Sequence, residues 1–301
     1  MKPKAGIPFQ FGISLCAALL LLAIAAPAAL ADLVPDPAMA RLSPLSSLGG
    51  FFGDWFAMAS RAQAEQPHWI TPLVTVTPRL EQELRYDQFF QSSSEGNVAT
   101  DSFDGGKGLE IIPEGHTEVI VGMPPFLKRT RPRNTDGFGD WPFLLKLRLL
   151  SANEDSGNYI VTAFMGFSVP TGSNVNGSGH GIFTPTLAFG KGFGDFDVQS
   201  TVGVALPSGG LDRLGLPVAY NTTFQYRVFK YLWPEFETNY TWFSYGKKTG
   251  HNQLFLTPGI VMGRFPIHDR IGVTLGTGVQ IAATKYRSYN HNWIITARIP
   301  F

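Results

Sequence analysis

The chain ends in the stretch YNHNWIITARIPF, residues 289–301. Its odd-numbered positions are mostly apolar, whereas its even-numbered positions are mostly polar, apart from Ile294 and Pro300. A period of two places the two sets on opposite faces of a β-strand. This stretch therefore predicts a strand with one apolar face and one polar face, and the chain finishes on an aromatic residue, Phe301.

The same alternation recurs along the preceding chain, over residues 196–206, 217–229, 231–244 and 269–283. In 231–244, for example, Phe236, Tyr240 and Trp242 alternate with Glu235, Glu237 and Asn239. A soluble sandwich rarely sustains this pattern in strand after strand, whereas each crossing of a membrane barrel takes about 9–11 residues. We therefore expect membrane-spanning strands, and the last one resembles the C-terminal signal that the barrel-assembly machinery of the outer membrane reads.

Twelve strands can be marked in this way. They span residues 78–90, 107–113, 116–124, 138–150, 158–168, 183–192, 196–206, 217–229, 231–244, 252–264, 269–283 and 289–301. Connections after odd-numbered strands are mostly long and those after even-numbered strands mostly short, as in outer-membrane barrels with long outer loops and short periplasmic turns. We predict an all-β fold, a transmembrane antiparallel up-and-down β-barrel of about 12 strands. Ten or fourteen strands stay open because 107–113 alternates poorly.

The N-terminus carries the signals of export. Lys2 and Lys4 precede an apolar run that closes on Ala29-Leu30-Ala31. These features predict a signal peptide over residues 1–31, cleaved before Asp32, with a retained membrane anchor as the alternative. The only cysteine, Cys16, lies in this leader, so residues 32–301 have no disulfide framework.

The composition narrows the class of protein. Charged residues make up 16% of the chain and aromatic residues 13%, and the net charge is +1. A net charge near zero argues against a nucleic-acid partner. After residue 31 no stretch approaches the roughly 18 uncharged apolar residues of a membrane helix. The apolar residues are spread out instead, as they are in a barrel.

Residues 32–77 do not alternate and form a separate N-terminal segment before the barrel, which we place at 78–301. Phe51, Phe52, Trp55 and Phe56 recur at helical spacing, which indicates a short amphipathic helix. This partly helical segment could plug the lumen, lie on the periplasmic rim or be mobile.

The face opposite the lipid should line the lumen. It carries ten charged residues: Glu81, Glu83, Arg85, Asp87, Lys146, Arg148, Arg227, Glu235, Glu237 and Arg298. Buried charges persist when they are paired or hydrated. The set therefore fits either a polar conduit or a salt-bridged lumen that only stabilises the wall, and twelve strands favour a narrow path over a wide pore.

Six aromatic residues lie at positions predicted to face lipid, and they gather near the two ends of their strands. Trp141, Trp242 and Trp293 fall near outer ends, whereas Tyr159, Phe196 and Phe301 fall near inner ends, as in the two girdles of a membrane barrel. An outer loop also carries Lys128, Arg129, Arg131 and Arg133. These predict contact with lipopolysaccharide phosphates, or simply a solvated loop.

Signals for catalysis are weak, and we expect no enzyme, no cofactor and no metal. The histidines are scattered without a metal-ligand spacing. Ser173 and Ser178 lie near His180 in one outer loop, but no third residue to orient the imidazole can be identified.

Several motifs resemble a bacterial outer-membrane family described as transporters of the phenol-degradation (MetA) pathway. They are Gly137-Phe138-Gly139-Asp140-Trp141, the run from Leu145 to Leu150, Val169-Pro170-Thr171-Gly172-Ser173, the run from Thr186 to Lys191, Asn292-Trp293 and Pro300-Phe301. The resemblance covers roughly residues 78–301 and implies uptake of small, often aromatic compounds. We therefore expect an outer-membrane channel or transporter for passive uptake of small molecules, with hydrophobic or aromatic cargo as candidates. A closed structural or surface barrel is the alternative, followed by an outer-membrane hydrolase.

Overall fold

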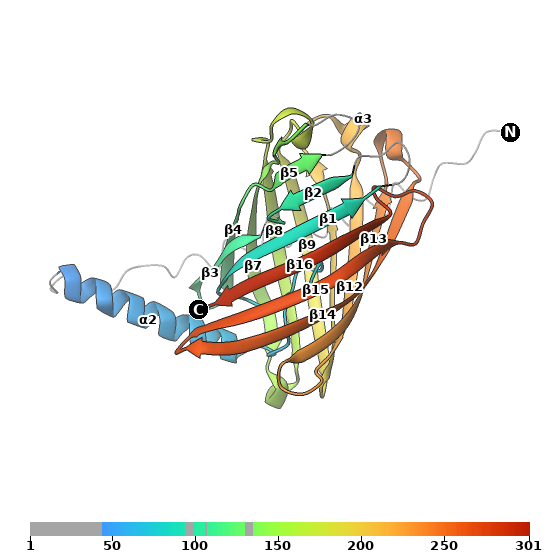
Figure 1. Cartoon of the computed structure of the whole chain (residues 1–301). Helices are drawn as coiled ribbons and strands as arrows, with labels where there is room; N and C mark the ends of the chain where they lie inside the picture. The colour runs from blue at the N-terminus through green and yellow to red at the C-terminus, as the bar shows by residue number, and fades with distance from the viewer. Residues whose placement is uncertain (1–43, 94–98, 106, 130–134) are drawn as a thin grey trace.

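The computed structural model describes residues 44–93, 99–105, 107–129 and 135–301. Twelve strands form one closed antiparallel ring (Figure 1). In chain order they are β1 (Glu83–Ser92), β3 (Gly108–Glu114), β4 (Thr117–Gly122), β7 (Trp141–Ala152), β8 (Tyr159–Val169), β9 (Ile182–Phe193), β10 (Phe196–Val204), β12 (Pro217–Tyr226), β13 (Leu232–Phe243), β14 (Asn252–His268), β15 (Ile271–Ala282) and β16 (His291–Pro300).

The ring closes between its first and last strands. β16 pairs with β1 along a continuous antiparallel ladder that runs from Glu83 opposite Pro300 to Ser92 opposite His291. Neighbouring strands otherwise follow chain order, as expected of an up-and-down barrel. Each of the twelve predicted strand ranges overlaps one ring strand, so the predicted fold class is confirmed.

Four short strands lie outside the ring: β2 (Thr100–Phe103), β5 (Phe126–Arg129), β6 (Gly137–Phe138) and β11 (Leu206–Pro207). β2 and β5 lie in predicted outer loops, and β6 spans the start of the predicted strand 138–150. These three extend the wall outward between β1 and β7. β1 therefore pairs with β3 at only two positions, Glu83 and Leu84, and with β2 from Gln88 to Gln91.

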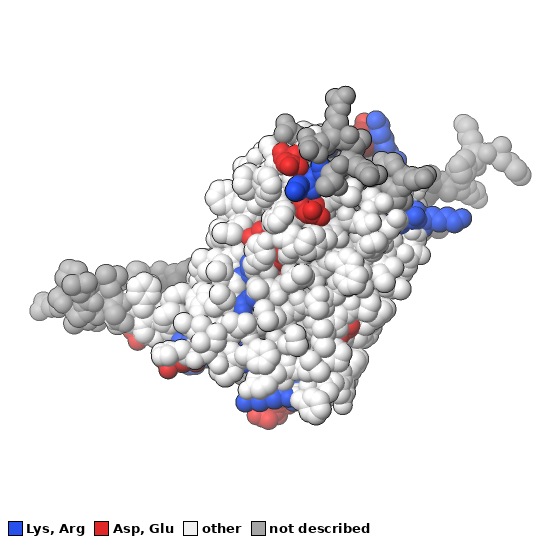
Figure 2. Space-filling view, in the orientation of Figure 1, with Lys and Arg blue, Asp and Glu red and all other residues white. Residues whose placement is uncertain are grey.

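The two faces of the wall differ in polarity. Large apolar side chains are exposed on the outside, among them Leu84, Tyr86, Phe236, Leu275 and Ile295. Figure 2 shows few charged atoms over β14, β15 and β16. Charges gather at the two ends of the barrel, and a few are also visible at mid-height beside β1. The inward face carries buried Thr, Gln, Asn, Glu and Arg side chains. This is the reverse of a soluble protein and fits a wall surrounded by lipid.

The six aromatic residues predicted as girdles lie near the ends of the wall. Trp141 begins β7, Trp242 lies near the outer end of β13, and Trp293 lies near the outer end of β16. At the inner end, Tyr159 and Phe196 begin β8 and β10, and Phe301 follows β16. Trp141, Trp293 and Tyr159 are exposed, whereas the other three are half-buried.

The N-terminal boundary of the barrel differs from the prediction. We expected a strand from residue 78, but β1 begins at Glu83, and residues 78–82 lie inside the ring. The odd-numbered positions from Arg79 to Asp87 are all buried. The charged residues therefore alternate in the same way before and within β1, and the pattern does not show where the strand begins.

A helix precedes the barrel. α2 (Pro44–Ala64) lies at the inner end and runs across the barrel axis (Figure 1). Among the described residues, no helix is both long and apolar enough to cross a bilayer. α3 (Leu211–Leu214) and the 3₁₀ turns η4 (Asn174–Asn176) and η5 (Gly246–Lys248) lie in the outer loops, and η3 (Glu154–Ser156) lies in an inner turn.

Candidate functional site

The lumen of the barrel is filled by the chain itself. Residues 66–82, the luminal segment, join α2 to β1, and nearly all of them are buried. Both ends of the segment lie at the inner end of the barrel because α2 passes there and β1 begins there opposite Pro300. The segment therefore forms a loop that enters the lumen from the inner end of the barrel and returns to that end.

The two legs of this loop are tied to each other. The amide of Gln66 donates to the carbonyl of Leu80 (2.8 Å) and accepts from the Leu80 N–H (2.9 Å). The guanidinium of Arg79 donates to the carbonyls of Pro67 and Trp69. These bonds satisfy buried backbone groups that would otherwise lack partners. The luminal segment thus carries much of its own hydrogen bonding.

The apex of the loop presents three successive N–H groups to β13. The N–H of Leu73 donates to Glu235 Oε1 (3.0 Å), and the N–H groups of Val74 and Thr75 donate to Glu237 (2.7 and 2.6 Å). The hydroxyl of Thr75 adds a further bond to Glu237 (2.6 Å). Glu235 and Glu237 therefore hold the apex by its backbone donors.

Two arginines bind the carbonyl groups of the same apex. Arg298 on β16 donates to Thr71 O and, at 2.8 Å, to Pro72 O. Arg85 on β1 donates to Leu73 O at 2.7 Å, and its Nε is 2.9 Å from Asp87. The wall thus supplies acids where the segment has donors and guanidinium groups where it has acceptors.

Further contacts reach the segment from other sectors of the ring. Gln199 on β10 donates to Ile70 O (3.1 Å) and accepts from the Thr77 hydroxyl (2.7 Å). Thr162 on β8 and Lys146 on β7 donate to Pro78 O (2.6 Å) and Arg79 O (3.0 Å). On β14, Arg264 lies 2.7 Å from Glu81. The segment is therefore bound by side chains from many strands of the ring.

Two apolar side chains of the segment fit places where the wall has no side chain. A β-carbon at Gly278 would lie 2.6 Å from Leu73 Cδ1, and one at Gly276 would lie 2.8 Å from Leu73 Cδ2. A β-carbon at Gly190 would lie 2.5 Å from the ring of Trp69. Real β-carbons do not come so close to a neighbour, so these glycines leave room for Leu73 and Trp69. Around them pack Ile70, Ile160, Trp233, Val261 and Ile294.

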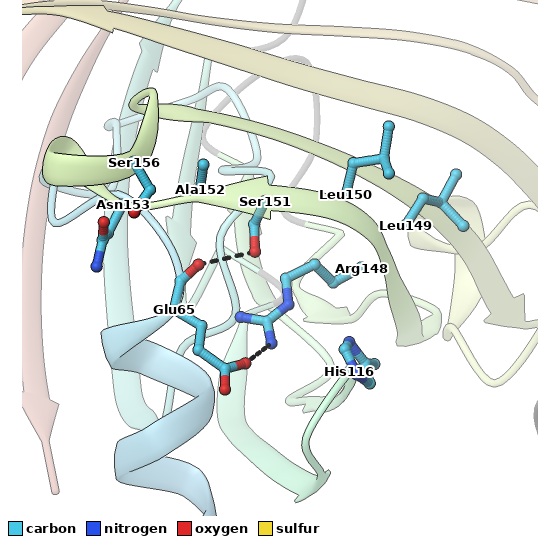
Figure 3. A pocket seen from close by; sticks show the side chains of 9 residues that line it. All are labelled: Glu65, His116, Arg148, Leu149, Leu150, Ser151, Ala152, Asn153 and Ser156. Atoms are coloured by element: carbon cyan, nitrogen blue, oxygen red, sulfur yellow. Dashed lines mark hydrogen bonds and ion pairs between the residues drawn. The ribbon is translucent and has the colours of Figure 1, made fainter.

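The inner rim caps the end of α2 (Figure 3). Arg148 lies 3.0 Å from the Glu65 carboxylate and also donates to the carbonyls of Ala62 and Gly115. Ser151 donates to Glu65 O at 2.8 Å. The last carbonyls of a helix lack partners within it and carry partial negative charge, which a guanidinium stabilises. These groups line a rim cavity of about 450 Å³.

A second rim contact joins the start of the luminal segment to the turn between β7 and β8. The carboxylate of Glu154 accepts from the backbone N–H of His68 (2.6 Å) and lies 2.8 Å from His68 Nδ1. Burial would raise the pKa of Glu154, but the hydrogen bonds from His68 outweigh it and leave this pKa below its ordinary value.

The lumen outward of the apex is lined by uncharged polar side chains. Asn239 Oδ1 accepts from Thr257 (3.1 Å) and Gln280 (2.9 Å), and Asn239 Nδ2 donates to Asn221 (3.3 Å). The hydroxyl of Tyr289 also donates to Gln280. We call Asn221, Asn239, Thr257 and Gln280 the outer amide cluster. It provides both donors and acceptors without formal charge, and its members Asn239, Thr257 and Gln280 are buried.

The structure buries nine of the ten predicted lumen residues: Glu81, Glu83, Arg85, Asp87, Lys146, Arg148, Glu235, Glu237 and Arg298. Arg227 corrects the prediction. It follows β12 in an inner turn, its side chain is 45% exposed, and it pairs with Asp195 at 2.6 Å. The reason is that β12 ends at Tyr226, so the alternation that we extended to 229 no longer applies.

Other predicted residues are placed as follows. Lys128 is exposed on β5, whereas Arg129 donates to Asn176 (2.6 Å); Arg131 and Arg133 lie outside the described residues. The hydroxyls of Ser173 and Ser178 donate to the carbonyls of Phe138 and His180 rather than to the imidazole. In the described part of the chain, no group of His, Cys, Asp or Glu could hold a metal ion.

Sequence reasoning missed several residues that hold the luminal segment. Glu118 lies in a predicted strand, on the parity opposite Val119 and Val121, and its Oε1 is 2.9 Å from Lys146 Nζ. Gln199 also lay on a predicted inward face. Parity could have identified both. The backbone groups of the segment itself carry no sequence signal, because any residue offers them.

No protein-family model matches the chain, and no curated protein sequence matches it. Among solved structures it is similar to the "COG4313 outer membrane channel from Pseudomonas putida F1", with a TM-score of 0.50 and 15% identity over 72% of this chain and 92% of that chain. It is also similar to the "KdgM porin", with a TM-score of 0.43 and 9% identity over 73% of this chain and 99% of that one. At such identities a likeness concerns the fold alone. The chain has the fold of an outer-membrane β-barrel.

Proposed function

We propose that the protein is an outer-membrane channel for passive uptake of small molecules, and that its luminal segment is a displaceable plug. The observation that carries this proposal is the way the wall binds the apex. Glu235 and Glu237 accept from its N–H groups, and Arg298 donates to its carbonyls. Each of these bonds could be exchanged for a bond to water or to a solute.

The polar groups of the lumen support displacement of the luminal segment by water. Leaving buried carboxylates and guanidinium groups without partners is expensive, so a dry, empty lumen is excluded. If the segment withdraws, water must enter and solvate Glu235, Glu237, Arg85 and Arg298. A barrel of eight strands is filled by its own side chains and one of sixteen holds water, so twelve strands suit a path that is open only without the plug.

The side chains that line the lumen indicate which class of solute would be transported. A solute from outside meets first the outer amide cluster and then the charged zone around the apex. This order favours small solutes that carry hydrogen-bonding groups. The phenol-degradation transporters that the sequence resembles imply aromatic cargo, and a hydroxylated or carboxylated aromatic compound would satisfy both requirements.

The alternative is a closed structural or surface barrel. In that case the luminal segment is a permanent core, and its contacts serve only to stabilise the wall. The buried apolar cluster around Trp69 and Leu73 favours this alternative, because withdrawal of the segment would expose this apolar surface to water. The two proposals differ in whether the segment can leave a folded barrel.

The location and partners belong to the same proposal. We place the protein in the outer membrane of a Gram-negative bacterium, after export on the predicted signal peptide and assembly through the C-terminal strand. Lys128, exposed on the outer strand β5, is then a candidate contact for lipopolysaccharide.

A reversible lock tests the proposal. Residues 32–301 contain no cysteine, so Leu73→Cys with Gly278→Cys gives a single pair, placed where the two side chains would meet. We expect proteoliposomes with the oxidised pair to be impermeable in swelling assays with small sugars and aromatic acids, and reduction to restore permeation. Leu73→Cys alone is the control, which should not respond to oxidant. Equal permeation of the oxidised and reduced pair would refute the plug.

A further inference from the structure

The N-terminal half of α2 extends past the barrel wall (Figure 1). Phe51 is 56% exposed and Phe52 is 48% exposed. Their ring contacts are to each other and to Trp55, which in turn contacts Phe56. Neighbouring aromatic side chains with this much exposure form an apolar patch that requires a partner.

The same face of the helix is covered in its C-terminal half. Ala59 and Ala62 pack with Leu80 and Ile112 under the barrel and are fully buried. Phe52 and Trp55 precede them at helical spacing and therefore share their face. Asp54 and Arg61 are exposed on the other side. The apolar face thus runs along the helix and passes from the barrel to the region outside the wall.

Two contacts hold the helix at the level where the wall ends. Trp55 Nε1 donates to Ile112 O near the inner end of β3, at 2.6 Å. Arg270, in the turn between β14 and β15, donates to Phe56 O at 3.0 Å and lies 4.9 Å from the Phe56 ring. The exposed aromatic patch therefore lies beside the inner edge of the lipid-facing surface and continues it.

The space between the helix and the rim combines charge with apolar surface. A cavity of about 280 Å³ lies here, and its lining includes Ser60 and Gln63 of α2 and Arg264, Arg270 and Ile271 of the wall. Arginines beside exposed apolar residues suit the boundary between headgroups and acyl chains. A soluble protein partner would not need this position at the edge of the lipid-facing wall.

We propose that α2 is an interfacial helix that lies in the inner, phospholipid leaflet of the outer membrane, with Phe51 and Phe52 in the acyl boundary and Arg270 at the headgroups. This inference rests on the membrane location in the proposed function but not on channel activity. In this arrangement the membrane holds the N-terminal end of the plug assembly, whose other end is fixed by β1.

A depth measurement tests the inference. In the cysteine-free chain 32–301, Phe52→Cys and Asp54→Cys each receive an environment-sensitive bimane label. The proteins are reconstituted in phosphatidylethanolamine–phosphatidylglycerol vesicles that contain lipids brominated near the glycerol end of the acyl chain. Gel migration with and without heating confirms that each labelled barrel is folded.

We expect the label at position 52 to be blue-shifted and quenched several-fold more strongly by brominated lipid than the label at position 54. The label at 54 should respond to iodide in the aqueous phase instead. Equal, weak quenching at both positions by brominated lipid would overturn the inference. Disulfide-linked dimers of the unlabelled Phe52→Cys protein, together with no lipid quenching of the labelled one, would also overturn it and assign the patch to a second copy of the chain. Because neither readout requires conductance, failure of the channel proposal remains distinguishable.

Discussion

Leu73, at the apex of the luminal segment, fits against Gly278 of β15 so closely that a β-carbon on the glycine would lie 2.6 Å from Leu73 Cδ1. The two residues are far apart in sequence, and the contact between them explains why each residue type is present. A leucine directed into the lumen needs a hollow in the wall, and a glycine in the interior of a strand weakens that strand unless something packs there. The wall therefore has a hollow that fits Leu73 of the luminal segment.

Gly278→Val should unseat the apex. The added side chain overlaps Leu73, and its β-carbon would also lie 2.9 Å from Pro258 O on β14. Overpacking of this kind costs about 1–3 kcal/mol. We expect the barrel to remain folded and the fraction of time spent open in planar bilayers to rise.

The double variant Gly278→Val with Leu73→Ala provides the control, because removal of the leucine side chain relieves the overlap with the luminal segment while the approach to Pro258 O remains. Its open fraction should fall back toward that of the parent. If Gly278→Val leaves the open fraction unchanged, the contact does not hold the plug in place.

Glu237→Gln should loosen the apex without unfolding the wall. Glu237 accepts from the N–H groups of Val74 and Thr75 and from the Thr75 hydroxyl. Hydrogen bonds to a charged group contribute about 1.5–3 kcal/mol, and a neutral amide retains only part of that. We expect faster hydrogen exchange at the Val74 and Thr75 amides, measured by mass spectrometry of peptides from the segment.

Glu110→Gln is the matched control for this prediction. Glu110 is a buried lumen carboxylate on β3, and its Oε1 has no hydrogen-bond partner among the described residues. The same change there should leave exchange in the segment unaltered. If hydrogen exchange became equally fast in both variants, the charge of the lumen in general, rather than the hydrogen bonds to the apex, would protect these amides from exchange.

The contact between Glu154 and His68 gives a pH dependence. The pKa of Glu154 is lower in the folded protein than its ordinary value of about 4.3, so the contact stabilises the seated segment at neutral pH. It is lost as pH falls through that lowered value.

We therefore expect the open fraction to rise in acid, and Glu154→Gln to remove one component of that rise while raising the open fraction at neutral pH. Bilayer recordings of both proteins between neutral pH and about pH 3.5 compare them directly, in the range where carboxylates titrate. Identical pH profiles would contradict a role for this contact.

The barrel could be predicted from the sequence because each strand carries its own alternation. Tyr240 and Trp242 had to face lipid if Glu237 and Asn239 faced the lumen, and the observed burial follows that division. The prediction of the strand boundary failed where the polar–apolar alternation continued past the end of the strand. Arg79 and Glu81 fall on the same odd-numbered positions as the inward residues of β1, but they belong to the luminal segment. A charged side chain can reach the lumen both from the wall and from the luminal segment, so the pattern alone does not distinguish the two.

The position of the luminal segment had no comparable signal in the sequence. Its apex is held through the backbone groups of residues 71–75, which are the same in every sequence. The glycines opposite Leu73 read only as strand residues, because the partner that explains them lies some two hundred positions away. The helical spacing of Phe51, Phe52, Trp55 and Phe56 did predict a helix, although α2 extends well beyond those residues.

The most direct test compares single-channel conductance of the chain 32–301 with that of a chain that begins at Gln82, both refolded and inserted in planar bilayers. The second chain lacks α2 and nearly all of the luminal segment but keeps every strand of the ring. We predict rare, brief openings for the first and stable, discrete conductance steps for the second. No conductance from the truncated chain, when gel migration shows a folded barrel, would contradict the account and leave a closed structural barrel.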